Sequence, residues 1–104
     1  MDEMTGGWFI GDFKPSIIKT KDYEVGYKIH KKGEHWPTHY HKVATEVTFV
    51  VSGKMTIQGK LLQTGDIFVL EPNEIADPVF LQDTSLVIVK SPSVIGDKYI
   101  VEEQ

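Results

Sequence analysis

The sequence predicts an all-β protein, a small barrel built from short strands. Runs in which apolar and polar residues alternate recur along the chain, and no segment shows a helical period. Gly53, Gly59 and Gly65 each end such a run, and this six-residue spacing is typical of hairpin strands joined by tight turns. All five prolines lie between the runs or at their edges, as strand ladders require. Many short strands with frequent turns favour a sandwich or barrel.

The expected strands follow the alternating runs in order. Residues 23–33 alternate and close on a glycine, and residues 54–58 alternate again. Residues 66–70 form a dense apolar run, which also indicates a strand. Further short strands are expected at 46–53, 79–82, 85–90 and 98–102.

Strand parity divides the side chains of residues 46–53 between two faces. One face is wholly apolar, whereas the other carries a carboxylate and is the one expected to point inward. Val50, Val79 and Leu81 are expected to share the inward parity and to line a pocket. The apolar face comprises Val47, Phe49 and Val51, and the inward face comprises Glu46, Thr48 and Val50.

The length and composition bound the class of protein. A chain of 104 residues is expected to form one domain, 1–104. The absence of cysteine excludes disulfides and thiolate ligands, so any metal would be held by nitrogen and oxygen. The acidic N-terminus lacks the pattern of a signal peptide, and no apolar run is long enough to span a bilayer. We therefore expect a cytoplasmic protein that does not act in a membrane.

The charge of the chain limits its partners. The net charge is −4, and all eleven basic residues are lysines. Without the bidentate guanidinium of arginine, a mildly acidic protein is a poor candidate for binding nucleic acid or for gripping a nucleotide diphosphate. The expected partner is a small-molecule substrate or ligand that is not strongly anionic, or one whose charge is met by a metal.

Three of the four histidines lie within residues 35–41, and a glutamate follows. His39 and His41 are two residues apart, so on a strand they project from the same face. Glu46 follows a short connection, and a hairpin would return it to the side of the histidines. Two imidazoles and a carboxylate on one wall of a barrel predict a metal site with nitrogen and oxygen ligands.

The neighbouring polar residues are weaker candidates. His35 lies outside the alternating face and is expected to be exposed, whereas His30 could face the cavity but fits a structural role better. Tyr40 points opposite to its histidine neighbours by strand parity, so we do not expect it in the site. Glu74 is expected to be a solvated loop carboxylate.

The same stretch resembles the first motif of the cupin family. That motif is a glycine, five residues, His-x-His, three or four residues, a glutamate, six residues and a glycine, and this chain matches each position. The resemblance implies a cupin-type double-stranded β-helix, also called a jelly-roll barrel, with the metal inside. The matching residues are Gly33, His39, His41, Glu46 and Gly53, with Pro37 where the family often has proline.

The second cupin motif is only partly kept in GDIFVLEPNEIAD (65–77). Gly65 and Asp66 fit, one extra residue precedes Pro72, and Asp77 fills the position of the family's last histidine ligand. Two histidines and two carboxylates would neutralise a divalent ion, which favours Fe(II) or Mn(II), with Zn or Ni as alternatives. If the shorter Asp77 does not reach the ion, the other three ligands would form a facial triad with open positions.

The resemblance implies a metal-binding enzyme that acts on a small oxygen-bearing organic molecule, with the metal as Lewis acid. Dioxygenase chemistry is expected if the metal is iron, and isomerase- or lyase-type chemistry is the alternative. No residue outside the metal shell stands out as a general base, which weakens the proton-transfer options. Two further hypotheses are a non-catalytic cupin that binds a small, sugar-like ligand and a metal-free degenerate scaffold.

The N-terminal segment, residues 1–22, is expected to form an edge strand or a dimer contact. Small cupins commonly pair through such a strand and one sheet face, and this segment carries more apolar surface than a small barrel readily covers alone. We therefore expect a homodimer. The apolar residues are Trp8, Phe9, Phe13, Ile17 and Ile18.

Overall fold

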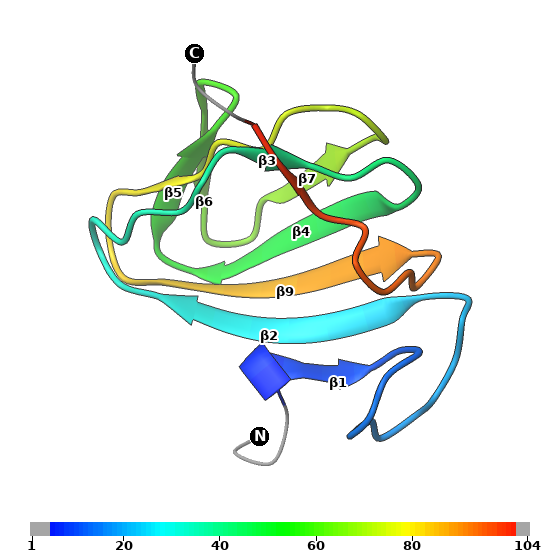
Figure 1. The fold of residues 1–104 in the computed structure, drawn as a ribbon. Helices are drawn as coiled ribbons and strands as arrows, with labels where there is room; N and C mark the ends of the chain where they lie inside the picture. Colours follow the sequence, from blue (N-terminus) through cyan, green and yellow to red (C-terminus); the bar gives the residue numbers. More distant parts are fainter. Residues whose placement is uncertain (1–4, 102–104) are drawn as a thin grey trace.

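The computed structural model describes residues 5–101 and confirms the all-β prediction (Figure 1). This part of the chain contains no α-helix, only the short 3₁₀ turn η1 (Thr5–Gly7). None of its helices is therefore long enough to cross a membrane. The strands are β1 (Trp8–Ile10), β2 (Glu24–His30), β3 (His39–Tyr40), β4 (Thr45–Ser52), β5 (Lys54–Ile57), β6 (Lys60–Gln63), β7 (Ile67–Leu70), β8 (Val79–Phe80), β9 (Thr84–Ser91) and β10 (Tyr99–Ile100).

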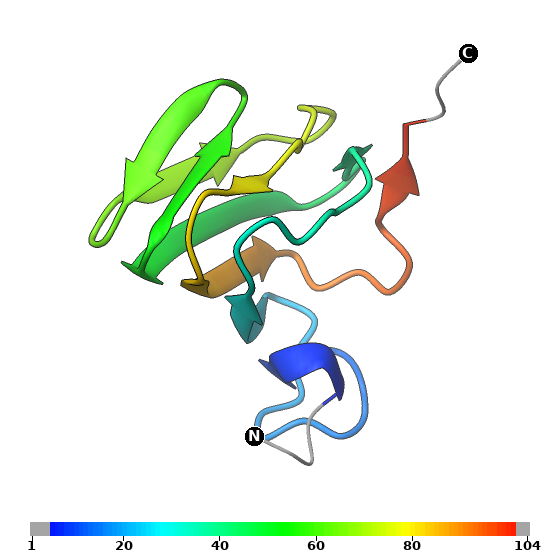
Figure 2. The same ribbon diagram turned by 90° about the vertical axis from the view of Figure 1, so that its left-hand side faces the viewer.

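The strands form one large antiparallel sheet and two small ones. The large sheet has the order β1-β2-β9-β4-β7, so strands far apart in the sequence are neighbours in space. A three-stranded sheet, β6-β5-β8, and a β10-β3 pair lie over one face of the large sheet (Figure 2). The two layers enclose the interior, and strands of both layers contribute side chains to it.

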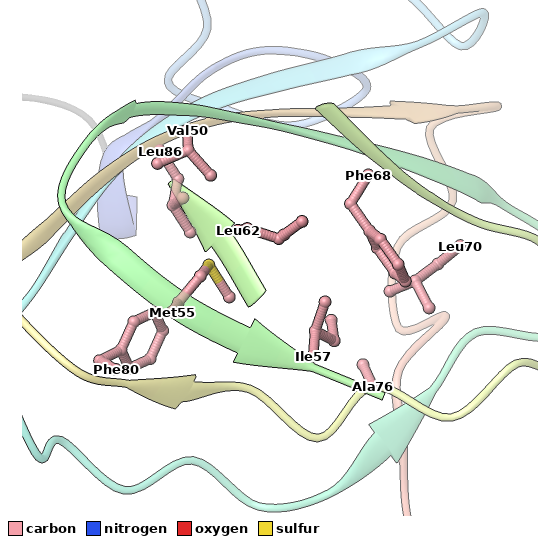
Figure 3. Close-up of a cluster of buried hydrophobic side chains, with 9 residues drawn as sticks. All are labelled: Val50, Met55, Ile57, Leu62, Phe68, Leu70, Ala76, Phe80 and Leu86. Carbon is pink, nitrogen blue, oxygen red and sulfur yellow. The ribbon is translucent and has the colours of Figure 1, made fainter. Parts of the chain in front are cut away.

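A cluster of buried apolar side chains fills one end of this interior (Figure 3). The side chains come from both layers and interdigitate, which removes their apolar surface from water. Trp36 and Ile88 pack against the cluster from the side. The cluster comprises Val50, Met55, Ile57, Leu62, Phe68, Leu70, Ala76, Phe80 and Leu86.

The inward face was predicted correctly for β4 but was the wrong one at β8. Glu46 and Val50 are buried on β4, as expected. Val79 is 52% exposed and Leu81 42%, whereas Phe80 between them is 3% exposed, so the expectation that Val79 and Leu81 line a pocket was wrong. Phe80 lies opposite the buried Met55 of β5, and paired residues share a face.

Two glycines allow close turns and contacts. Gly59 closes the β5–β6 hairpin with φ of 72°, and the preceding Gln58 also has a positive φ, as a type I′ turn requires. Gly26 of β2 lies opposite Trp8 of β1, and a Cβ atom there would approach Trp8 Cε3 to 2.7 Å. The glycine therefore lets the Trp8 ring lie directly over the sheet.

The N-terminal segment places β1 at the edge of the large sheet. Ile17 and Ile18 are exposed, but Trp8, which we had grouped with them as dimer surface, lines an interior cavity instead. Residues 1–4 of the expected 1–22 segment lie outside the described residues, as does the end of the expected strand 98–102.

Candidate functional site

A cavity of about 160 Å³ lies on the inner face of the large sheet, beside the apolar cluster. Its volume is below the roughly 300–1,000 Å³ typical of pockets for drug-sized ligands, so it suits a molecule of few atoms. Trp8 and Trp36 form parts of its wall, together with members of the apolar cluster such as Met55 and Phe80. Its charged and imidazole-bearing lining residues are Lys28, His30, His39, Glu46, Lys90 and Lys98.

The two histidines of the HxH pair have their Nδ1 atoms occupied by backbone carbonyls. His39 Nδ1 lies 3.0 Å from the carbonyl oxygen of Pro37, and His41 Nδ1 is hydrogen-bonded to that of Asp97. A carbonyl only accepts, so each Nδ1 carries the proton and donates it. Each Nε2 is then left with a free lone pair, the arrangement in which histidine binds metals.

His41 Nε2 is a buried polar atom with no hydrogen-bond partner among residues 5–101. Its side chain is 4% exposed, and the nitrogen lies 3.7 Å from Glu46 Oε1, too far for a hydrogen bond. The His39 ring is adjacent, with its centroid 5.5 Å from that of His41. An unpaired buried acceptor facing a carboxylate is costly unless a cation or proton lies between them.

Glu46 supplies the negative charge of this group. Burial alone would raise the pKa of Glu46, but the His41 ring and the Lys90 ammonium outweigh it and hold the pKa below its usual value. Burial, aided by the nearby Lys98 charge, lowers the pKa of His39 and keeps that ring neutral. An anionic Glu46 beside the neutral His39 ring is the protonation state that a metal requires of its ligands.

The structure brings three of the four expected ligands into one neighbourhood. His39 and Glu46 line the same cavity, and His41 is buried directly beside Glu46. Within the described part of the chain, no three acidic or histidine side chains are already spaced to hold one ion. The metal site therefore stays a prediction.

Asp77 lies apart from this group. Its carboxylate is exposed and accepts a hydrogen bond of 2.7 Å from the backbone N–H of Gln58, in the β5–β6 turn. Ala76, 2% exposed, lines the cavity instead and forms a backbone bridge with His39. The extra residue before Pro72 places Ala76, rather than Asp77, on the inward side, so the structure gives Asp77 no ligand role.

Asp97 positions the HxH stretch, and the sequence analysis missed it. Its carboxylate accepts hydrogen bonds from the backbone N–H groups of Lys42, Val43 and Ala44, at 2.9 to 3.2 Å. Burial would raise the pKa of Asp97, but these hydrogen bonds outweigh it and keep the pKa low. Asp97 thus holds both the His41 ring and the turn that leads to Glu46.

His30 is both structurally satisfied and part of the cavity wall. Its Nδ1 pairs with Glu34 Oε2, and its ring stacks on Phe80 at a centroid distance of 4.3 Å. Trp36 Nε1 donates to the same Glu34 oxygen at 2.5 Å. These hydrogen bonds, that of Trp36 first, lower the pKa of Glu34 and keep it anionic. As expected, His35 is exposed, and Tyr40 stacks on Tyr99, away from the cavity wall.

Three lysines converge on the cavity from separate segments. Lys28 lies on β2, Lys90 on β9 and Lys98 in the connection to β10. In the sheet register, Lys90 lies between Glu24 and Glu46 on the neighbouring strands. No local pattern in the sequence signals this convergence, because each lysine stands alone in its own segment.

Comparison with solved structures identifies the fold. No protein-family model and no curated protein matches the chain. A double-stranded β-helix protein from Klebsiella pneumoniae is similar with a TM-score of 0.73 and 21% identity, over 84% of this chain and 76% of that one. The DMSP lyase DddQ from Ruegeria pomeroyi has a TM-score of 0.75 and 14% identity, over 91% of this chain.

The chain spans only 51% of the DddQ chain. An RmlC-like cupin from Ralstonia eutropha is also similar, with a TM-score of 0.62 and 12% identity, over 80% of this chain and 58% of that one. At these sequence identities, the similarity shows a shared fold. The protein adopts the double-stranded β-helix fold of the cupins, as its first motif predicted.

Proposed function

We propose that this protein is a metal-dependent cupin enzyme that acts on a small oxygen-bearing organic molecule. The observation that supports this most directly is the buried, unpaired Nε2 of His41 facing Glu46. Both histidines of the pair also hold their Nδ1 protons on backbone carbonyls, which leaves Nε2 as the ligating atom.

The residues that would hold the ion are His39, His41 and Glu46. Two imidazoles and one carboxylate make a facial set with open positions, which favours Fe(II) or Mn(II). When bound, the ion supplies Lewis-acid polarisation of a substrate oxygen. Asp77 is left out of this set because its carboxylate is exposed and bonded to the Gln58 N–H.

His30, for which the sequence favoured a purely structural role, adds a proton carrier at the cavity. Its Nδ1 is held by Glu34 and the ring lines the cavity, which leaves Nε2 as the nitrogen available to exchange a proton with a substrate. A base beside the substrate supports isomerase- or lyase-type chemistry over the dioxygenase alternative. One protein of similar fold, DddQ, is named a lyase, which fits this choice.

The test is the metal content of protein purified without a histidine tag or chelators. We expect near-stoichiometric metal in the wild type and its loss in H41A and E46Q, with the fold retained by circular dichroism. H35A is the matched control, because His35 is exposed and outside the group. Metal-free wild-type protein that also fails to bind added Fe(II), Mn(II), Zn(II) or Ni(II) would contradict the proposal.

A second candidate is a non-catalytic binding protein. Its specific support is Ala76, whose methyl group lies where the family's fourth ligand would be expected to face the cavity. The two candidates differ in turnover, so the metal-loaded wild type should be incubated with small organic acids and sugars and the mixtures analysed by NMR. Conversion of one compound, lost in H30Q, supports the enzyme; binding without conversion across the panel supports the binding protein.

A further inference from the structure

The cavity carries more positive than negative side-chain charge. Lys28, Lys90 and Lys98 line it, and Glu46 is the carboxylate in its wall. Within residues 5–101, the ion pairs shorter than 4.0 Å all involve histidines, so no carboxylate of this part of the chain neutralises a lysine at contact. A bound divalent cation would add to this excess of positive charge.

Aromatic rings hold the three ammonium groups at the cavity. Lys28 Nζ lies 5.0 Å and Lys90 Nζ 4.9 Å from the centroid of one Trp8 ring. Lys98 Nζ lies 4.7 Å from the Trp36 ring. Such cation–π contacts fix the long side chains, so less rotamer entropy is lost when a ligand binds.

The positive charges of the lysines also repel one another. Burial is the first cause that lowers the pKa of Lys28, and the charges of Lys90 and Lys98 lower it further. Burial and then Lys90 likewise lower the pKa of Lys98. Like charges gathered in a partly dry site are unfavourable in the free protein, and an anion placed among them relieves that repulsion.

The nearby carboxylates, those of Glu24 and Glu46, do not neutralise the lysines at contact distance. Glu24 and Glu46 flank Lys90 in register, but neither carboxylate makes a contact ion pair with it. Burial raises the pKa of Glu24 despite the opposing charge of Lys90, and Glu24 lines a neighbouring cavity that shares Lys90 and Lys98 with this one. Lys28 Nζ donates one hydrogen bond to the Gly6 carbonyl, and no other acceptor within residues 5–101 takes its remaining protons.

We propose that Lys28, Lys90 and Lys98 form the subsite for the carboxylate of a small organic acid, the substrate class of the proposed enzyme. The apolar walls at Ile57, Leu86 and Ile88 would cover the body of the acid, and the volume of about 160 Å³ limits it to a few carbon atoms. Lysine ammoniums suit one carboxylate held by separate point charges. That the bound acid is a substrate rests on the proposed function, but the anion subsite itself does not require a metal.

Intrinsic fluorescence reports on this subsite selectively, because the chain has two tryptophans and both line the cavity under a lysine. Protein as purified and chelator-treated protein should be titrated at constant ionic strength with butyrate, butyramide and inorganic phosphate. We expect saturable changes with butyrate in both preparations, and binding of the neutral butyramide at least about tenfold weaker.

Variants of the lysines complete the test. K90Q and K98Q should weaken butyrate binding by about fivefold or more, whereas K31Q, at an exposed lysine outside the cavity, should change it by less than about twofold. Lys98 is exposed in a connection, so K98Q should fold even if K90Q does not, and thermal unfolding checks both.

Three outcomes overturn the inference: equal binding of butyrate and butyramide, equal effects of K31Q and K98Q, or binding of phosphate in preference to butyrate. Butyrate binding by a protein that takes up no metal would refute the proposed function and leave the subsite standing. Metal uptake without butyrate binding would refute the subsite and leave the proposed function standing.

Discussion

The backbone carbonyl of Asp97 accepts the Nδ1 proton of His41, a contact that joins residues 56 positions apart. The side chain of Asp97 simultaneously binds the N–H groups of residues 42–44. The C-terminal connection therefore sets the orientation of a candidate ligand and the path of the chain toward the next one, Glu46. This dependence of the site on a distant loop leads to the first prediction.

Replacing Asp97 by alanine should destabilise the protein by about 2–4 kcal/mol, because the buried N–H of Ala44 and the part-buried N–H groups of Lys42 and Val43 lose a charged acceptor. D97N should be milder, since its amide oxygen still accepts. Denaturant unfolding measures both. Metal affinity should fall in both variants if the orientation of His41 matters. A D97A protein as stable as wild type would contradict the role assigned to Asp97.

Asp97 also predicts a pH dependence. Its pKa is lower in the folded protein than in the unfolded chain, so the stability it contributes is complete above the unfolded value of ~3.9. That contribution is lost as the pH falls below this value and through the lower folded pKa. The acid limb of the wild-type stability curve should therefore flatten in D97N, and an unchanged limb would contradict the assignment.

Ala76 and Asp77 offer a direct test of strand parity at the second motif. A76H would place an imidazole on the cavity side, opposite His39, and should raise metal affinity by about tenfold or more. D77H, one residue away on the exposed side, is the matched control and should have little effect. Competition with a metal-sensitive dye measures both affinities. A gain in metal affinity in D77H but not in A76H would show that residue 77, as the second motif suggests, faces the metal site in solution.

Gly26 should be intolerant of a side chain because its Cβ would approach the Trp8 ring to 2.7 Å. We expect G26A to destabilise the protein by about 1–3 kcal/mol and to shift the tryptophan emission. The double variant W8A/G26A should be less destabilised than the sum of the single changes, because the clash is removed. If the two single destabilisations simply add in the double variant, the cost of G26A does not come from the contact with Trp8.

The outer face of the large sheet is the surface on which we propose that two copies pair. Two rows of apolar residues cross strands β2, β9, β4 and β7, and every member is exposed or half-buried. An exposed apolar sheet face suits a two-fold dimer, whose partners would each bury roughly 800 Å². The rows are Val25, Val89, Val47 and Val69, and Tyr27, Val87, Phe49 and Ile67.

F49E should therefore convert the proposed dimer into a monomer, since it sets a charge in the middle of that face. L61E is the matched control, because Leu61 is also exposed but lies on β6, in the other layer. Sedimentation at micromolar concentration measures both. A wild-type protein that sediments as a monomer would remove the dimer proposal.

The alternation of residues by itself determined the all-β class and the inward position of Glu46 and Val50. These features are local, because a period of two assigns neighbouring side chains to opposite faces wherever the strand lies. The HxH pair and the glutamate five positions later are also close in sequence, so a short connection keeps them neighbours. The expected hairpin between them was wrong, because β3 pairs with β10 whereas β4 pairs with β7 and β9.

The tertiary structure alone decided what surrounds these residues. Asp97 reaches His41, and Lys28, Lys90 and Lys98 meet, only because β2, β9 and the final connection become neighbours in space. At the second motif, one inserted residue reversed the parity and turned Ala76 inward in place of Asp77. Pairing between distant strands sets such registers, and no short stretch of sequence contains them.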